Sequence, residues 1–405
     1  MHNKIKSHIR NNSIFWVIIV LGICVRILLN SAVDSFDFHA FVMWANYLTV
    51  HRIADAFTYL PEGYTPYPPL YYYILWFLGR TISFLGVWEN KWLTYLIIRI
   101  PVIAADTLIA YLIYLFTQKN MSKKEAIIAV IFYFLHPAVI YNTSIWGRID
   151  AIVTLLGFLS VVAFLSKQNF WGIGLYILGV ITKLQILALL PLIVFLSLNK
   201  KPGIHKFFTS LLVWGAIAFL PFVPIVYVNG FKWTWDYFFT IPNWYAYTSI
   251  YAYNIWAPFG FIVSDNTKLF GLIAYKFIGI GLFWFVAFII LYPLFKKVNR
   301  TPQAIMYAAF LLWFDFAFFA TRIHSRYLIY SFGFFAPFSA KFPKLAALIS
   351  IIMIGNLLLP NKNVVLSAFV YWLNQPIVIA GIVIFAFCIF IYSYKLYIKR
   401  ILRRV

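Results

Sequence analysis

The stretch IFWVIIVLGICVRILL at residues 14–29 decides the fold class of this chain. It follows the basic residues Lys4, Lys6 and Arg10. An apolar run behind positive charges is typical of a helix that enters a membrane from the cytoplasmic side. Because no small-residue cleavage site accompanies the run, we expect a retained transmembrane helix and not a removed signal peptide.

The rest of the sequence is equally apolar. Of the 405 residues, 63% are hydrophobic and 11% are charged, which excludes an ordinary soluble protein. One membrane helix needs roughly 20 apolar residues, so the chain can furnish about twelve crossings. We therefore predict an all-α integral membrane protein, a bundle of about 12–13 transmembrane helices with interfacial helices in the first external loop.

The positive charge of the chain marks its topology. The 33 Lys and Arg residues outnumber the 11 Asp and Glu residues, which gives a formal net charge of +22. The basic residues form short clusters between apolar runs, as cytoplasmic loops do, and this distribution argues against a nucleic-acid partner. Cys24 and Cys388 lie inside apolar runs and indicate neither a disulfide framework nor a metal site.

The alternation of basic clusters and apolar runs predicts the side of each loop. Both termini are expected in the cytoplasm. The segments expected outside it are residues 32–67, 142–150, 182–185, 229–268 and 321–327. The basic clusters lie at residues 4–10, 119–124, 200–206, 296–300, 341–344 and 395–404.

The apolar run at residues 68–86 does not fit this alternation. Counted as a full crossing, it would give an odd number of crossings between the first two basic clusters, which must lie on the same side. The run contains Arg80, which is costly to expose to lipid, so we expect the segment to be re-entrant or broken. Two modules are predicted. Residues 1–228 carry the first external loop, and residues 229–405 carry the later external loop and a basic turn.

The first external loop contains the candidate for catalysis. Asp37 opens the stretch Asp37-Phe-His-Ala-Phe-Val-Met-Trp44. A carboxylate at the membrane surface can take a proton from an acceptor hydroxyl, although it could also be only a helix cap or an N-terminal charge. Asp34 is the competing carboxylate. The rings of Trp44 and Tyr67 could stack on a sugar or anchor among the headgroups.

A second external element is Trp146-Gly-Arg148-Ile-Asp150. Trp146 offers a platform for a sugar ring, and Gly147 permits close approach. Arg148 and Asp150 lie two residues apart, so on a helix they diverge instead of pairing. We predict sugar or acceptor contacts for Trp146, Arg148 and Asp150; the alternative is a charged loop between two helices.

Two further elements indicate a phosphate site. Lys183 and Gln185 lie between two apolar stretches of half the usual length, which suggests broken helices around a cavity. The turn that holds Arg322, His324 and Arg326 gathers donors of the kind that bind phosphate oxygens. We predict that these five residues bind a phosphate; the alternative for the lysine is a side chain that reaches up to the membrane surface.

Asp106 and Asp315 fall inside predicted membrane helices. Arg99 precedes Asp106 by seven residues, about two helical turns, and lies on the same face. Intramembrane charges are costly and are usually paired or functional. The sequence leaves open whether these acids form ion pairs within the bundle or contact a ligand.

Six short motifs follow one another within residues 10–335. They are Asp37, Phe38, Ala40 and Trp44; Tyr67 to Leu70; Arg99 and Asp106; Trp146, Gly147 and Asp150; Lys183 to Pro191; and His324, Ser325 and Arg326.

In this order the motifs resemble the GT-C superfamily of polytopic glycosyltransferases, which use lipid-phosphate sugars. The nearest resemblance is to the branch that contains the GPI-mannosyltransferase-like proteins and the endoplasmic-reticulum glucosyltransferases of N-glycan assembly. It implies a GT-C-type bundle, with Asp37 as general base and with Lys183, His324 and Arg326 on the donor phosphate. Ser325 stands where the family usually has Glu.

The resulting prediction is a multi-pass hexosyltransferase with its active site outside the cytoplasmic membrane, expected to be that of a prokaryote. It would transfer a hexose, mannose before glucose, from a polyprenyl-phosphate or dolichyl-phosphate donor to a hydroxyl of a saccharide, lipid or protein, with inversion. No cofactor is expected and metal independence is favoured, since no external Asp-x-Asp pair occurs. The alternative is a transporter or flippase of a lipid-linked saccharide.

Overall fold

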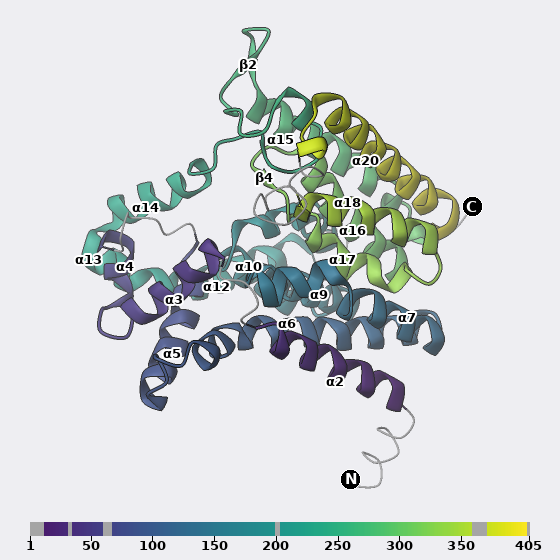
Figure 1. Cartoon of the computed structure of the whole chain (residues 1–405). Coiled ribbons are helices and arrows are strands. Elements are labelled where there is room, and N and C mark those ends of the chain that lie inside the picture. Colours follow the sequence, from purple (N-terminus) through teal and green to yellow (C-terminus); the bar gives the residue numbers. More distant parts are fainter. Residues whose placement is uncertain (1–11, 31–34, 60–66, 199–202, 359–370, 403–405) are drawn as a thin grey trace.

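The fold is a bundle of α-helices with two short β-pairings (Figure 1). The computed structural model describes residues 12–30, 35–59, 67–198, 203–358 and 371–402. The longer helices are α2 (Ser13–Leu28), α3 (Phe36–Tyr47), α5 (Leu70–Leu85), α6 (Lys91–Asn120), α7 (Lys123–Phe134), α9 (Asp150–Leu165), α10 (Asn169–Val180), α12 (Gly203–Phe219), α14 (Phe231–Thr240), α15 (Tyr275–Leu291), α16 (Pro302–Phe319), α18 (Pro343–Leu358) and α20 (Pro376–Leu396).

Shorter elements join these helices. The short α-helices are α4 (Ile53–Tyr59), α8 (Pro137–Ile140), α11 (Leu190–Leu198), α13 (Val223–Asn229) and α17 (Ile329–Phe335). The 3-10 and π turns are η2 (Tyr141–Ile145), η3 (Leu184–Leu189), η4 (Leu220–Phe222), η5 (Ile241–Asn243), η6 (Ala257–Phe259), η7 (Tyr292–Phe295), η8 (Lys297–Asn299), η9 (Ala336–Phe338) and η10 (Tyr397–Ile401). The strands are β1 (Ser249–Ile250), β2 (Lys268–Leu269), β3 (Ile273–Ala274) and β4 (Ile323–His324).

Several helices are long and apolar enough to cross a bilayer. Within the described residues there are five, or six if the bent pair of Lys123–Phe134 and Pro137–Ile145 is one span. The five are Lys91–Asn120, His205–Asn229, Tyr275–Phe295, Pro302–Phe319 and Pro376–Ile401. The chain is therefore nearly all α-helical, and the length and composition of these helices fit a multi-pass membrane protein. The larger number of crossings and the GT-C-type arrangement stay predictions.

Six further apolar helices have only 10–17 residues. Two of them, Asn169–Val180 and Leu184–Leu198, flank Lys183. The half-length stretches predicted around this lysine are therefore present as separate helical pieces.

The run at 68–86 forms α5, one continuous helix that does not meet the length and apolarity of a span. Gly79 lets α5 approach α3 closely, because a Cβ there would lie 2.2 Å from the backbone oxygen of Ala45. Arg80 is on the exposed side. The segment is therefore unbroken within the described residues, and whether it re-enters the membrane stays a prediction.

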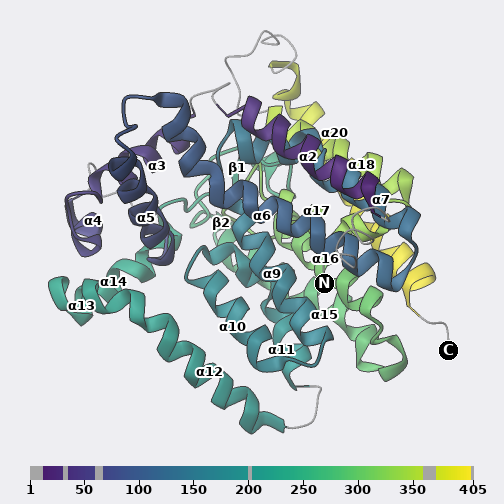
Figure 2. The ribbon, with the colours of Figure 1, turned by 90° about the horizontal axis from the view of Figure 1, so that it is seen from below.

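Figures 1 and 2 place α3, α4, α5, α13 and α14 together at one end of the molecule. The centre of the bundle contains α6, α9 and α16, which are rich in fully buried apolar side chains. The helix α12 runs along the periphery with few buried residues (Figure 2).

A buried ion pair joins two helices in this core. Arg26 of α2 donates from Nε and Nη2 to Oδ2 of Asp106 in α6, at 3.1 and 3.0 Å. Tyr133 and Thr143 also donate to this carboxylate, at 2.8 and 2.7 Å. Asp106 is thus fully engaged inside the bundle, which favours the structural alternative over ligand contact.

The side of each loop can be read with an enzyme reporter that is active only outside the cytoplasm. We expect active fusions after residues 55, 145, 245 and 323 and inactive fusions after 121, 202, 298 and 342, because basic clusters remain inside. An active fusion at 121 would make 68–86 a full crossing, and one at 298 would refute the whole topology.

Candidate active site

A cavity of about 480 Å³ opens between the two predicted modules. It is lined by residues of α3, of the segment around Lys183, of α15 and of the turn that contains β4. Nine of the twelve predicted site residues line it: Asp37, Trp44, Tyr67, Arg148, Lys183, Gln185, Arg322, His324 and Arg326. Asp34 lies outside the described residues.

The start of α3 sets the position of Asp37. Ser35 is the N-cap of this helix, since its Oγ accepts from the backbone N of Phe38 at 3.2 Å. The same hydroxyl donates to the carbonyl of Trp146 at 2.9 Å, which ties the helix start to the segment 146–150. Ser35 therefore performs the capping role, and Asp37 in the first turn is left for other contacts.

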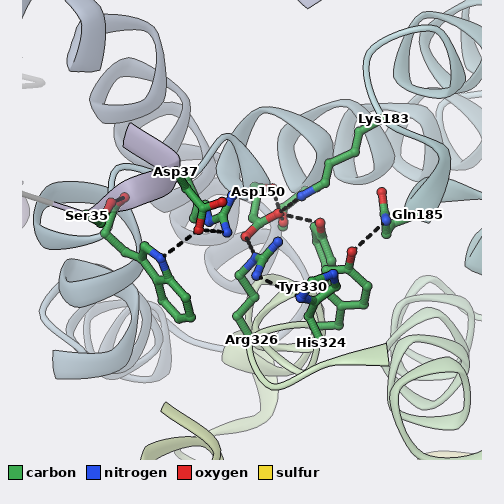
Figure 3. A network of polar contacts seen from close by, with 12 residues as sticks. Ser35, Asp37, Asp150, Lys183, Gln185, His324, Arg326 and Tyr330 are labelled. Carbon is green, nitrogen blue, oxygen red and sulfur yellow. Dashed lines mark hydrogen bonds and ion pairs between the residues drawn. The ribbon is translucent and has the colours of Figure 1, made fainter. Parts of the chain in front are cut away.

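The carboxylate of Asp37 is held from one side. Its Oδ2 accepts from Trp146 Nε1 at 3.2 Å and forms an ion pair with Arg148. No described residue bonds to Oδ1, and the side chain is 25% exposed. Asp37 therefore has one fixed oxygen and one oxygen open to a ligand in the cavity (Figure 3).

Gly147 allows the segment 146–150 to pack closely against α3. Its φ of +71° is a left-handed conformation that glycine adopts readily. A Cβ there would lie 2.3 Å from the ring of Phe38. The close approach that this glycine permits is thus to α3, and it brings Arg148 within reach of Asp37.

Asp150 lies behind the cavity wall at the start of α9, with its side chain 1% exposed. It pairs with Lys183, accepts a hydrogen bond from Tyr330, and has Arg326 Nε at 3.6 Å from Oδ2 (Figure 3). This one carboxylate therefore holds two cations of the site from behind the lining, and its predicted sugar or acceptor contact stays a prediction.

Trp146 likewise supports the wall and does not line the cavity. Its ring lies 5.3 Å from the guanidinium carbons of both Arg148 and Arg326. Cations near an indole face are attracted by the ring quadrupole. The tryptophan thus contacts two arginines of the site, and its predicted role as a platform for a sugar ring stays a prediction.

Burial changes the acid–base properties of Lys183 and His324. Burial, together with the charges of Arg326 and Arg148, lowers the pKa of Lys183 to about 8 and outweighs the opposing effect of Asp150. Burial and the same cations lower the pKa of His324 well below its usual range. At neutral pH, Lys183 is charged and the imidazole is neutral.

A neutral His324 can still bind an anion. Its Nδ1 lies 3.3 Å from Arg326 Nη1, which fits an accepting nitrogen. The proton of the neutral ring then sits on Nε2, where it can be donated to a ligand oxygen. The histidine thus acts as a hydrogen-bond donor and not as a third charge beside Lys183 and Arg326.

Arg322 belongs to a different part of the rim. Its Nε donates to Asp265 Oδ2 at 2.6 Å, and its Nη1 donates to the carbonyl of Pro242 at 2.9 Å. Strand β1 pairs in parallel with β4, so the 241–250 segment is fixed beside the basic turn. The predicted phosphate ligands therefore separate into an inner group at Lys183 and Arg326 and an outer arginine.

Gln185 keeps one polar atom for a ligand. Its Nε2 donates to the hydroxyl of Tyr327 at 2.7 Å, whereas its Oε1 meets no donor among the described residues. A buried acceptor without a donor is costly. A hydroxyl in the cavity would satisfy it.

Two groups of lining residues were not among the predicted site residues. Tyr245 and Lys276 lie at the rim, and burial raises the pKa of Tyr245 to about 12. The tyrosine-rich stretch 244–253 was the available signal for Tyr245. An apolar wall completes the cavity; its members include Leu187, Phe277, Ile280, Phe283 and Trp284. These residues were hidden among other apolar residues of membrane helices.

The intramembrane residues Arg99 and Asp315 do not line the cavity. The guanidinium of Arg99 lies 3.5 Å from the ring centre of Phe38 and donates to Asn30 Oδ1 at 3.2 Å. Asp315 is fully buried, and its two oxygens meet no hydrogen-bond partner in the described part of the chain.

The charges around the cavity suit an anionic ligand. Five cations line it, and three carboxylates lie in the lining or directly behind it, so positive charge exceeds negative charge by two among the described residues. No group of three His, Cys, Asp or Glu side chains in that part of the chain could hold a metal. No family model matches the sequence, and no curated protein matches it significantly.

Proposed function

We propose that the protein is a membrane glycosyltransferase of the GT-C type. It would transfer a hexose, with mannose favoured, from a polyprenyl-phosphate donor to an acceptor hydroxyl on the external face of the membrane. The observation that carries the proposal is one cavity that combines a half-open carboxylate, Asp37, with the cations Lys183 and Arg326 and an apolar wall.

The two halves of the cavity suit the two halves of such a donor. Lys183 and Arg326 supply charge-assisted contacts for a phosphate. The apolar wall formed by α15 and η3, with Ile280 and Leu187 among its members, suits an isoprenoid chain. Gln185 and the rings of Trp44 and Tyr67 remain for the sugar.

The proposed reaction is a single displacement. The acceptor oxygen attacks the anomeric carbon and forms the new glycosidic bond, while the bond between that carbon and the phosphate oxygen breaks. Oδ1 of Asp37 takes the hydroxyl proton, and the polyprenyl phosphate leaves with the electron pair beside Lys183 and Arg326. Attack opposite the leaving group inverts the anomeric centre.

The deciding experiment is a transfer assay with purified protein, a polyprenyl-phosphate mannose and a panel of saccharide, lipid and protein acceptors. Formation of a mannosylated product with inverted configuration supports the proposal. Movement of the intact donor across a liposome membrane without transfer would instead identify the alternative, a flippase of lipid-linked saccharides.

The first variants test the phosphate site. We expect Lys183→Ala and Arg326→Ala each to weaken donor binding by about tenfold or more, because each removes a charge-assisted contact worth roughly 1.5–3 kcal/mol. Binding is measured with the lipid donor in detergent, beside a melting curve for each variant. Lys296→Ala, an exposed lysine away from the cavity, is the control. Wild-type donor affinity in both site variants would remove the phosphate assignment.

The titration of Lys183 gives a pH prediction. Because burial lowers the pKa of this lysine to about 8, its charge is present below that pH and is lost as the pH rises through it. We expect kcat/KM for the donor to fall above about pH 8, since this parameter reports the free enzyme. Lys183→Arg should move the fall to higher pH, because arginine stays charged. An unchanged profile in Lys183→Arg would show that another group titrates.

A further inference from the structure

Helix α14 (Phe231–Thr240) presents three distinct sectors around its axis. One sector packs on the protein and contains Thr234, Tyr237 and Phe238, which are buried or half-buried. The second carries exposed aromatic rings, and the third carries an exposed ion pair. A helix whose exposed surface has one apolar sector and one charged sector is typical of a membrane interface.

The aromatic sector is a continuous row of Phe231, Trp235 and Phe239. These residues are 59%, 55% and 62% exposed. Successive ring centres lie 6.0 and 4.5 Å apart, so the row is preorganised by its own contacts. Residues four apart stay on one side of a helix.

The charged sector lies beside this row. Lys232 Nζ donates to Asp236 Oδ2 at 2.6 Å, and the two side chains are 90% and 57% exposed. Each follows an aromatic residue by one position, which rotates it by about 100° around the helix. The ion pair and the aromatic row therefore face different directions, so water can reach the ion pair while the row contacts a less polar environment.

The helix that precedes α14 in the chain indicates that this environment is lipid. The helix His205–Asn229 is long and apolar enough to cross a bilayer, and only 17% of its apolar window is buried in the protein. Its exposed surface includes Leu212, Leu220 and Tyr227, at 74%, 63% and 87%. Gly230 then turns the chain with a φ of +84°. The row on α14 thus continues a lipid-facing surface at the point where the chain leaves the membrane.

We propose that α14 lies in the plane of the membrane surface, with Phe231, Trp235 and Phe239 seated at the boundary between headgroups and acyl chains. Lys232 and Asp236 face the water. The partner is the lipid surface itself, and the inference does not depend on the sugar-transfer reaction.

Helix α14 connects α4 to the rim of the cavity. On one side, Phe57 of α4 contacts Tyr237 and Phe238 at ring distances of 5.9 and 5.5 Å. On the other side, α14 continues into Ile241 and Pro242, which line the cavity. A lipid-bound α14 therefore fixes the first external loop and the rim near Arg322 at one depth.

Spin labelling in nanodiscs of phosphatidylcholine and phosphatidylglycerol tests the proposal. After Cys24→Ser and Cys388→Ser, a nitroxide is attached to single cysteines at positions 231, 232, 235, 236 and 239. We expect faster collision with oxygen than with a water-soluble nickel chelate at 231, 235 and 239, and the reverse at 232 and 236. All five side chains are exposed, so the substitutions leave the packed sector intact.

Two results would overturn the proposal. Equal exposure to the nickel chelate at all five positions would place α14 in water. Protection of 231, 235 and 239 from both reagents would mean that protein covers the row. Either result leaves the transfer assay untouched, and a failed transfer assay leaves the labelling pattern untouched, so the two proposals are refuted separately.

Discussion

Asp37→Asn is expected to bind the lipid donor nearly as well as the wild type and to lose turnover by about 10²–10⁴-fold, the usual loss for a missing general base. Asparagine can still accept from Trp146 and Arg148 through its amide oxygen, so the wall geometry is kept. It cannot take a proton from a hydroxyl at neutral pH. The measurement is turnover at saturating donor, beside donor affinity and a melting curve.

Asp34→Asn is the matched control for this prediction, since it changes a carboxylate three residues away in the same loop. It should lose much less turnover. Wild-type turnover in Asp37→Asn would end the general-base hypothesis. Loss of turnover in Asp34→Asn alone would move the base to that residue.

Asp106→Leu is expected to lower the free energy of unfolding by about 3–5 kcal/mol, because it leaves a buried arginine without its counter-charge. Arg26 is fully buried and would keep only its bonds to the carbonyls of Gly22 and Phe134. The expected observation is a clearly lower melting temperature in mild detergent.

The double variant Arg26→Met with Asp106→Leu separates charge from packing. Removal of both charges should restore much of the stability, since no uncompensated ion remains and apolar replacements of buried ion pairs are often tolerated. A double variant as unstable as Asp106→Leu would show that Tyr133 and Thr143 need the carboxylate for other reasons.

The fold class was predictable because membrane helices are defined by composition. The broken helix around Lys183 was predictable from the two short apolar stretches on either side of it. The number of crossings was harder, because several apolar helices here are shorter than a bilayer is thick. Length alone does not distinguish a short span from a helix buried in the bundle.

The sequence indicated which charged residues belong to the site, but it did not indicate which of them form ion pairs with one another. Asp37, Lys183 and Arg326 could be selected because each is a charged residue at the end of an apolar run. Asp106 illustrates what was missed. Residues seven apart on one helix are separated by about 10 Å along the axis, so Arg99 cannot pair with Asp106, and Arg26 from the neighbouring helix does so. Such partners depend on helix packing, which no local pattern encodes.

The shared carboxylate of Asp150 implies a compromise between folding and affinity. Without it, Lys183 and Arg326 would be two like charges buried side by side in the empty protein, and mutual repulsion would oppose assembly of the wall. With it, the net charge of this cluster falls from +2 to +1, and an incoming phosphate must compete with a resident anion for the same two cations. The group that lets the unliganded protein form its binding wall is therefore the group that limits how tightly the wall can hold a phosphate.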